Sequence, residues 1–491
     1  MTHHGLKPHA DLRCALRLGL IAAVVLVTGL LPQPTAAQDD IERYQDRLDQ
    51  IERETRLEVD TALPVDQRMQ FDYGGFLSFN FLAIDDIDQE THILRQTNLT
   101  GFARLNIDDV HHFFLRGRTT YNDFNTNDDF SVHGDDYVEP TLDRGYYQLD
   151  LGRAADAYGE GRKFDLTFKG GRQRVHLANG LALSEVLDGG VVTLGNEDLQ
   201  LMTFAGMTRR SAVDFDSSRP NFSGDTERFF GGGQITWLAS ARHRPFLYGF
   251  AQEDRNDSIV SSAADTTTQF HYDSYYIGLG SEGSLGDRLV YGAELVYQGG
   301  RGLSSSVDAD FDSTTQEREE ISAFAADLRL DYTFQGPHRL RLGGELLYAT
   351  GDVDRLHTNN TLGGNQAETD DHAFNAFGFI NTGLSFSPDP SNLLMARTSI
   401  SAYPLPGKGI FSRLQVGADL FVYGKPNRHA PIEETTGDHN YLGLETDFFA
   451  NWQMTSDLAF NFRYGVFFPG SAIETDHDAR HFFFSGVTLA F

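Results

Sequence analysis

The chain has 491 residues, and its 38 Phe, 19 Tyr and 49 Gly give it the composition of strands and turns rather than of a helical bundle. Its formal net charge of -30 argues against nucleic acid as a partner. The one cysteine, Cys14, lies in the N-terminal segment, so the rest of the chain has no thiol for disulfides, metal clusters or nucleophilic catalysis.

Residues 1–37 have the order of a secretory signal peptide. Lys7 and Arg17 precede the apolar run from Leu18 to Leu31, and small residues follow it up to Ala37. A signal anchor is the alternative, although the run is short for a membrane-spanning helix. We therefore expect cleavage near Ala37.

Residues 38–70 are expected to form a short periplasmic helix and a linker. Ile41, Tyr44, Leu48 and Ile51 recur at spacings of three and four, as on one face of a helix. This face would suit a coiled-coil trimer handle, but it spans fewer than the three heptads that identify a coiled coil. A solvated or plugging helix is the alternative, and both a monomer and a trimer remain open.

From residue 71 to residue 491, apolar and polar residues alternate along successive segments, as in strands with one apolar face. In lipid, only a closed barrel satisfies every backbone group of such strands. A soluble β-sandwich is the alternative, but it seldom exceeds about 250 residues as one domain. We therefore predict an all-β fold, a transmembrane antiparallel β-barrel of about 18 strands. The expected strands are residues 71–84, 92–107, 112–124, 142–151, 163–175, 186–194, 198–208, 227–239, 244–253, 270–283, 287–299, 319–334, 337–350, 391–402, 410–423, 440–453, 457–468 and 480–491.

The last of these segments have the pattern of outer-membrane barrel strands. In residues 440–453, Leu444 and Phe448 fall on one parity, while Glu445 and Asp447 fall on the other. The chain then ends on Phe491, a terminal aromatic residue that we expect to engage the barrel assembly machinery.

The segment 374–386 is apolar enough to be a further strand. A nineteenth strand would break the alternation of the connections, because both chain ends must face the periplasm. We therefore expect 374–386 to belong to a long loop that folds into the lumen as a constriction. The alternative is that it is a strand and that 186–194 or 198–208 is not.

If the apolar parity faces lipid, the other parity lines the pore. Guanidiniums are permanently charged and bind carboxylates bidentately, so an inward row of them favours the passage of anions, above all polycarboxylates. The alternative is that they pair with inward acids such as Asp327 and Glu345 and only stiffen the wall. The arginines on the inward parity are Arg104, Arg116, Arg118, Arg329, Arg339, Arg341, Arg397, Arg413 and Arg463.

Acidic residues gather in the expected loops, where they are either solvated or bind divalent ions at the lipopolysaccharide surface. Asp308, Asp310, Asp312 and Glu319 have a spacing similar to that of a calcium loop, but Ser313 stands where such a loop requires glycine. The histidines lack a metal-ligand spacing, and no nucleophile or nucleotide-binding motif appears. We therefore expect no metal, no cofactor and no enzymatic activity.

Several short motifs are distinctive. They are YLGLETD at 441–447 followed by Trp452, RYGVFFPG at 463–470, the closing strand to Phe491, GRQ at 171–173, and FN at 374–375 followed by SNL at 391–393. With these motifs the sequence resembles the alginate export porin family of Gram-negative outer membranes.

The resemblance implies an eighteen-stranded pore with an arginine-rich constriction that conducts an anionic polysaccharide. By motif it implies that Arg172 and Arg463 face the pore. Simple alternation instead puts Arg172 on the lipid side with Phe164 and Phe168, so an inward Arg172 requires a bulge at Gly170–Gly171.

We therefore expect a channel of the cell outer membrane that passively transports an anionic, alginate-like polysaccharide or oligosaccharide. Its partners would be outer-membrane lipid, lipopolysaccharide and the anionic carbohydrate. One alternative is a general or small-anion-selective porin. Another is a barrel enzyme such as a lipase or protease, which would need a nucleophile with a histidine partner. The sequence leaves export and uptake equally open.

Overall fold

The computed structural model describes most of the chain from Met69 to the C-terminus. The described residues are 69–126, 128, 134–157, 164–209, 212, 226–240, 242–256, 261–263, 266–303, 306–307, 316–355, 365–366, 368–475 and 477–491. The expected signal peptide, the expected periplasmic helix and the aspartates of the calcium-like loop lie outside them.

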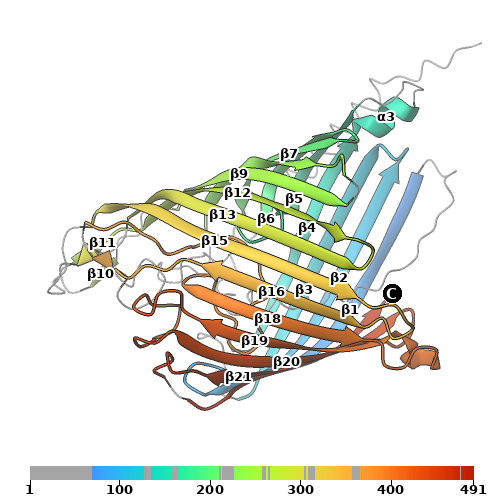
Figure 1. The fold of residues 1–491 in the computed structure, drawn as a ribbon. Helices are drawn as coiled ribbons and strands as arrows, with labels where there is room; N and C mark the ends of the chain where they lie inside the picture. The colour runs from blue at the N-terminus through green and yellow to red at the C-terminus, as the bar shows by residue number, and fades with distance from the viewer. Residues whose placement is uncertain are drawn as a thin grey trace, which may run out of the picture.

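The described residues form a closed barrel of 18 antiparallel strands (Figure 1). Consecutive long strands are hydrogen-bonded neighbours, and β1 (Met69–Asp85) pairs with β22 (Arg480–Ala490) to close the ring. Each segment expected from the sequence overlaps one of these strands, so the predicted fold is confirmed. The other long strands are β2 (Thr91–Ile107), β3 (His111–Phe124), β4 (Asp136–Asp150), β5 (Asp165–His176), β6 (Ser184–Gly195), β7 (Leu199–Thr208), β8 (Arg228–Trp237), β9 (His243–Asp254), β12 (His271–Leu285), β13 (Leu289–Leu303), β15 (Arg318–Thr333), β16 (Arg341–Ala349), β18 (Leu393–Ala402), β19 (Leu414–Gly424), β20 (Tyr441–Gln453) and β21 (Leu458–Pro469).

The two ends of the barrel differ in their connections. The helix α3 (Leu151–Ala157) and the C-terminus lie at one end in Figure 1, and the short strands β10 (Ser261–Ala263) and β11 (Thr266–Thr268) lie at the other. Long connections mark the extracellular end of outer-membrane barrels, so α3 is at the periplasmic end. The remaining short elements are β14 (Ser306–Val307), β17 (Asn365–Gln366) and the 3₁₀ turn η2 (Gly409–Arg413). No helix in the described part of the chain is long and apolar enough to cross a membrane.

Alternation along the strands separates an apolar outer face from an inner face. On β1, Phe79 is 53% exposed while the neighbouring Ser78 and Asn80 are 2% and 6% exposed. The hydroxyl of Ser78 lies 3.1 Å from that of Thr488 across the closing seam. In aqueous surroundings so many exposed Phe, Leu and Ile side chains would be unfavourable, whereas lipid accepts them.

β4 begins at Asp136, earlier than the expected residue 142. Its pairing with β3 shifts register twice, between Arg116 and Gly117 and between Arg118 and Thr120. An extra residue in a bulge reverses the parity of the residues after it, and this reversal hides the first part of β4 from a search for simple alternation.

The segment 374–386 contains no regular strand, as predicted, and it forms part of what we call the long inward loop, residues 371–390. The backbone amide of Asn375 in this loop donates to Gln298 Oε1 (2.9 Å), and the backbone carbonyl of Asn375 accepts from the Tyr276 hydroxyl (2.5 Å). Gln298 and Tyr276 are both fully buried on the inner face. The loop therefore lies inside the barrel, against β12 and β13.

A second segment inside the barrel, residues 177–183, is called here the short inward loop. Backbone bonds join the two loops, from Phe377 N to Ala182 O (3.0 Å) and from Phe379 N to Gly180 O (2.8 Å). Leu181 packs with inward aromatic residues of β8, β9 and β12 in one apolar cluster. The two loops thus share a core that fills one side of the lumen.

Candidate functional site

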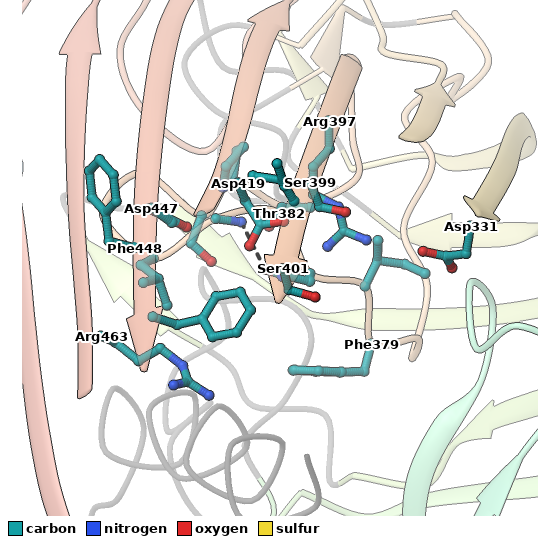
Figure 2. A pocket seen from close by; sticks show the side chains of 18 of the residues that line it. Asp331, Phe379, Thr382, Arg397, Ser399, Ser401, Asp419, Asp447, Phe448 and Arg463 are labelled. Atoms are coloured by element: carbon teal, nitrogen blue, oxygen red, sulfur yellow. Dashed lines mark hydrogen bonds between the residues drawn. The ribbon is translucent and has the colours of Figure 1, made fainter. Parts of the chain in front are cut away.

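A cavity of about 620 Å³ lies between the long inward loop and the inner faces of β15 to β21 (Figure 2). Arg341, Arg397 and Arg463 line it together with Asp419 and Asp447. Asp419 and Asp447 are directly opposite each other on β19 and β20. Strands far apart in the sequence therefore bring guanidiniums and carboxylates to one aqueous space beneath the loop.

Acidic residues form ion pairs with Arg341 and Arg397 of this cavity, and with Arg329 on β15. Glu345 accepts a hydrogen bond from Arg329 (2.9 Å) and forms an ion pair with Arg397 (2.5 Å), and Arg329 also forms an ion pair with Asp327 (2.7 Å). Arg341 pairs with Asp331 at 2.8 Å. Such pairs hold guanidiniums in fixed positions and reduce the net field in the lumen.

Arg463 has uncharged groups among its neighbours. Its Nη1 donates to Asn451 Oδ1 (2.6 Å), and its guanidinium lies 5.3 Å from the centre of the Phe449 ring. Both contacts involve uncharged groups, and Arg463 itself is only 5% exposed. The amide and the ring therefore help to fix the position of the Arg463 guanidinium on the inner wall.

A buried carboxylate attaches the long inward loop to the wall beside this cavity. Glu445 accepts from the backbone amides of Leu384 (2.5 Å), Ser385 (2.7 Å) and Phe386 (2.9 Å), and it is 0% exposed. The hydroxyl of Tyr423 donates to Thr382 O at 2.8 Å and lies 3.2 Å from Glu445 Oε2. Glu445 of the YLGLETD motif therefore holds the loop against the wall.

Two glycines let the long inward loop fit into this space. Gly383 has φ 115°, and a Cβ there would lie 2.4 Å from the Tyr423 hydroxyl. A Cβ on Gly378 would lie 1.9 Å from the carbonyl oxygen of Leu181 in the short inward loop. Any larger residue at either position would clash with these atoms and displace the loop.

The inner faces of β2 to β5 carry a second group of cations. Arg104, Arg116 and Arg118 lie on the predicted inward parity, since they share it with the buried residues Asn98 and Thr120. Arg116 pairs with Asp143, the residue at the β4 bulge. Among the described residues, no ion pair involves Arg104, although Asp72 lies opposite it on β1.

Sequence reasoning missed two cations of this wall. Arg144 lies directly opposite Arg116, and Lys169 lies opposite Gln148 on the neighbouring strand pair. The bulge at Asp143 is what turns Arg144 inward, and alternation alone could not have located that bulge.

Three of the predicted pore arginines lie elsewhere. The pairing of β5 with β4 and β6 is continuous, so the bulge that an inward Arg172 requires is absent and Arg172 keeps the outward parity of Phe168. There it forms a bidentate pair with Asp188, with both N–O distances 2.7 Å. Arg339 precedes β16 and faces the ring of Tyr403, and Arg413 ends the η2 turn. Placing these three on the inner strand wall was wrong.

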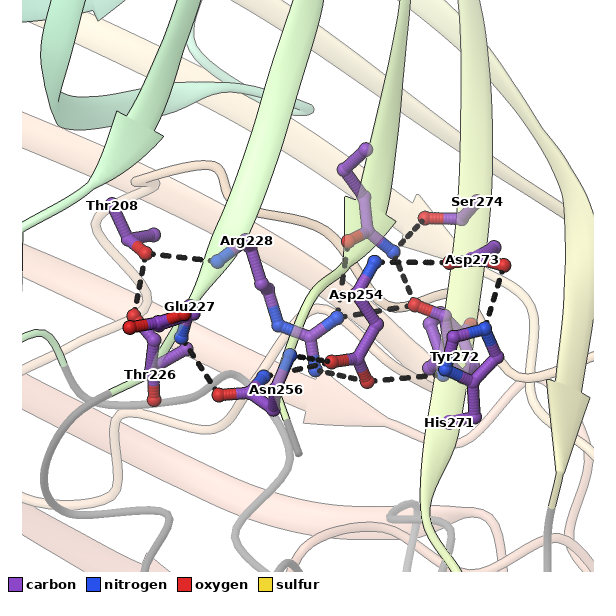
Figure 3. Close-up of polar contacts among 11 residues, drawn as sticks. Thr208, Thr226, Glu227, Arg228, Asp254, Asn256, His271, Tyr272, Asp273 and Ser274 are labelled. Carbon is purple, nitrogen blue, oxygen red and sulfur yellow. Dashed lines mark hydrogen bonds and ion pairs between the residues drawn. The ribbon is translucent and has the colours of Figure 1, made fainter. Parts of the chain in front are cut away.

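A further inward arginine, Arg228, is completely buried at the extracellular end of the barrel. Arg228 donates to Gln252 Oε1 (3.0 Å) and to Tyr272 O (3.1 Å), and it lies 3.5 Å from Asp254 (Figure 3). Both partners of this ion pair are at most 1% exposed. Arg228 is thus a structural residue that joins β8, β9 and β12, out of reach of a solute.

The described residues contain no group of three or more His, Cys, Asp or Glu side chains that could hold a metal ion. The arrangement of the site, with fixed charges around an internal cavity, suits the binding and passage of ions and polar solutes.

Comparison with known proteins identifies the family. The model of the family described as "Alginate export" matches residues 98–484. No curated protein matches the chain. The family and the fold are those of transport porins rather than enzymes.

Solved structures share the fold at low sequence identity. The crystal structure of Acinetobacter baumannii OccAB4 aligns with a TM-score of 0.52 at 8% identity, over 87% of this chain and 100% of that one. Pseudomonas aeruginosa OccK8 (OprE) aligns with a TM-score of 0.50 at 10% identity, over 86% and 98% of the two chains.

The family match and the closed barrel agree with the expected localisation. The protein is a channel of the cell outer membrane, where its apolar outer face contacts lipid. Since the family model covers most of its length, the chain belongs to the alginate export family.

Proposed function

We propose that this channel passively transports an anionic, alginate-like polysaccharide or oligosaccharide across the outer membrane. The observation that carries the proposal is the inner wall of β2 to β5, where Arg104, Arg116 and Arg118 lie on the inward parity. Arg144 and Lys169 extend this group of cations. Guanidiniums bind carboxylates bidentately, so a row of them offers successive positions to a polycarboxylate.

The cavity under the long inward loop supplies the narrow part of this path. Arg463 is held there by Asn451 and Phe449, and it is the predicted site residue that both the family motif and the cavity support. The acids Asp419 and Asp447 in the same cavity would weaken anion binding, which suits a channel that must release its solute.

Planar-bilayer recording tests this proposal. For the unmodified channel we expect a reversal potential that favours anions, and block by oligouronates added on one side. Arg463→Gln should reduce both effects, because it removes a charge from the narrow part of the path. Arg172→Gln is the matched control, since it removes an arginine that faces outward and should change neither.

A large conductance that oligouronates leave unaffected would refute the polysaccharide proposal. If small anions were still preferred in that case, the channel would be the small-anion-selective porin that the sequence left as the alternative. Equal selectivity of Arg463→Gln and the unmodified channel would assign Arg463 to the structure of the wall.

A further inference from the structure

Four aromatic rings lie on the inner wall of β1 to β4, within the cationic region. Phe76, Phe102, Phe114 and Tyr146 are half-buried, and each has inward parity. Phe76 stacks on Phe102 with 5.8 Å between ring centres, and Phe114 stacks on Tyr146 at 5.4 Å. The ammonium of Lys169 lies 3.8 Å from the centre of the Tyr146 ring.

Strand register interleaves these rings with guanidiniums. Phe102 on β2 lies opposite Arg116 on β3, and Arg104 on β2 lies opposite Phe114 on β3. Directly opposite residues on neighbouring strands are in side-chain contact range, about 5 Å apart. Each ring of this pair therefore has a cation beside it on the next strand.

Several inward rings elsewhere in the barrel are covered. Phe230 and Tyr276 are 0% exposed and Phe246 is 6% exposed, because they pack in the core with the two inward loops. Phe76, Phe102, Phe114 and Tyr146 belong to neither hydrophobic core cluster. Half-exposed apolar rings on a wall of cationic groups suit a ligand that has both an apolar face and a negative charge.

We propose that this ring-and-guanidinium wall, formed by Phe76, Phe102, Phe114 and Tyr146 with Arg104 and Arg116, is a binding site for the uronate units of the transported saccharide. A pyranose ring has a face of C–H groups that packs on an aromatic ring, and a uronate adds a carboxylate at its edge that a guanidinium binds bidentately. A phosphate, a sulfate or a small inorganic anion would use only the cations. The site deepens the proposed function and rests on it.

Dwell times of oligouronates in single-channel recordings test this site. We expect the double variant Phe102→Leu/Phe114→Leu to shorten the block by a uronate hexamer roughly tenfold, because two stacking surfaces are lost. The variant should change the chloride reversal potential far less than it changes the dwell time, since no charge is removed. Arg104→Gln should lower both anion preference and dwell time.

Phe113→Leu is the matched control, because Phe113 is next to Phe114 in the chain but faces outward beside Tyr147. Its dwell times should equal those of the unmodified channel. If the unmodified channel is blocked but Phe102→Leu/Phe114→Leu has the same dwell time, the ring-and-guanidinium wall is refuted while the proposed function stands. If the unmodified channel is not blocked at all, the proposed function fails, and this site with it.

Discussion

Replacing Glu445 with glutamine should release the long inward loop. The carboxylate accepts three backbone N–H bonds of 2.5, 2.7 and 2.9 Å and has no contact with solvent. Hydrogen bonds to a charged group contribute about 1.5–3 kcal/mol each, and glutamine retains one acceptor oxygen, so we expect docking to weaken by about 3 kcal/mol. The undocked fraction of the loop should then rise by roughly two orders of magnitude.

Single-channel recording would detect this release as frequent steps to a higher conductance, with a larger mean current than that of the unmodified channel. Tyr423→Phe, which removes only the hydroxyl bonds to Thr382 and Glu445, should give a smaller effect of the same sign. Gel mobility with and without heating would establish that each variant still forms a barrel. An intact Glu445→Gln barrel with unchanged conductance steps would refute the view that this carboxylate holds the loop.

Three other perturbations have predicted outcomes. Gly378→Ala should separate the two inward loops and raise the conductance, since its Cβ would lie 1.9 Å from Leu181 O, and limited proteolysis should show a newly cleavable loop. Asp419→Asn should shift the reversal potential further toward anions, because it removes a negative charge from the cavity; a shift toward cations would contradict the assigned position. Raising the salt from 0.1 M to 1 M shortens the screening length from about 10 Å to about 3 Å, so anion preference measured at a fixed gradient ratio should fall. Selectivity that does not vary with salt would indicate a steric rather than an electrostatic filter.

The barrel could be predicted from the sequence because its two faces meet different solvents. Lipid outside and polar groups inside enforce a period of two on most strands, so segment after segment showed the same signal. The requirement that both ends of the chain face the periplasm then excluded a strand at 374–386, and the structure has a loop there. Here topology was more informative than local hydrophobicity.

The arginines were less predictable because parity is lost at turns and bulges. Arg339 and Arg413 follow the alternation of the neighbouring strand in sequence, yet the chain turns at both of them. At Arg172 the alternation was correct, and the inward placement implied by the family motif was wrong. Arg144 faces inward only because a bulge precedes it.

The inward loops show a further limit. The short inward loop, residues 177–183, has leucines that are 0% exposed, but such a short apolar stretch between two strands has no distinctive period. One contact that holds this loop is a hydrogen bond of 2.9 Å from the backbone amide of Asn179 to the carboxylate of Glu294. Glu294 lies on β13, 115 residues further along the chain. Local sequence patterns cannot predict a contact between residues so far apart in the chain.

The seam that closes the ring has a consequence for how the protein is made. Ser78 and Thr488, which meet across the seam, are 410 residues apart, and Phe491 exchanges two backbone bonds with Gly75. Until the last strand arrives, β1 and the newest strand each expose a row of unpaired backbone groups, which hydrocarbon cannot satisfy. These groups are satisfied only when the seam closes, so we expect loss of the final residues to lower the yield of assembled barrel before it alters the permeability.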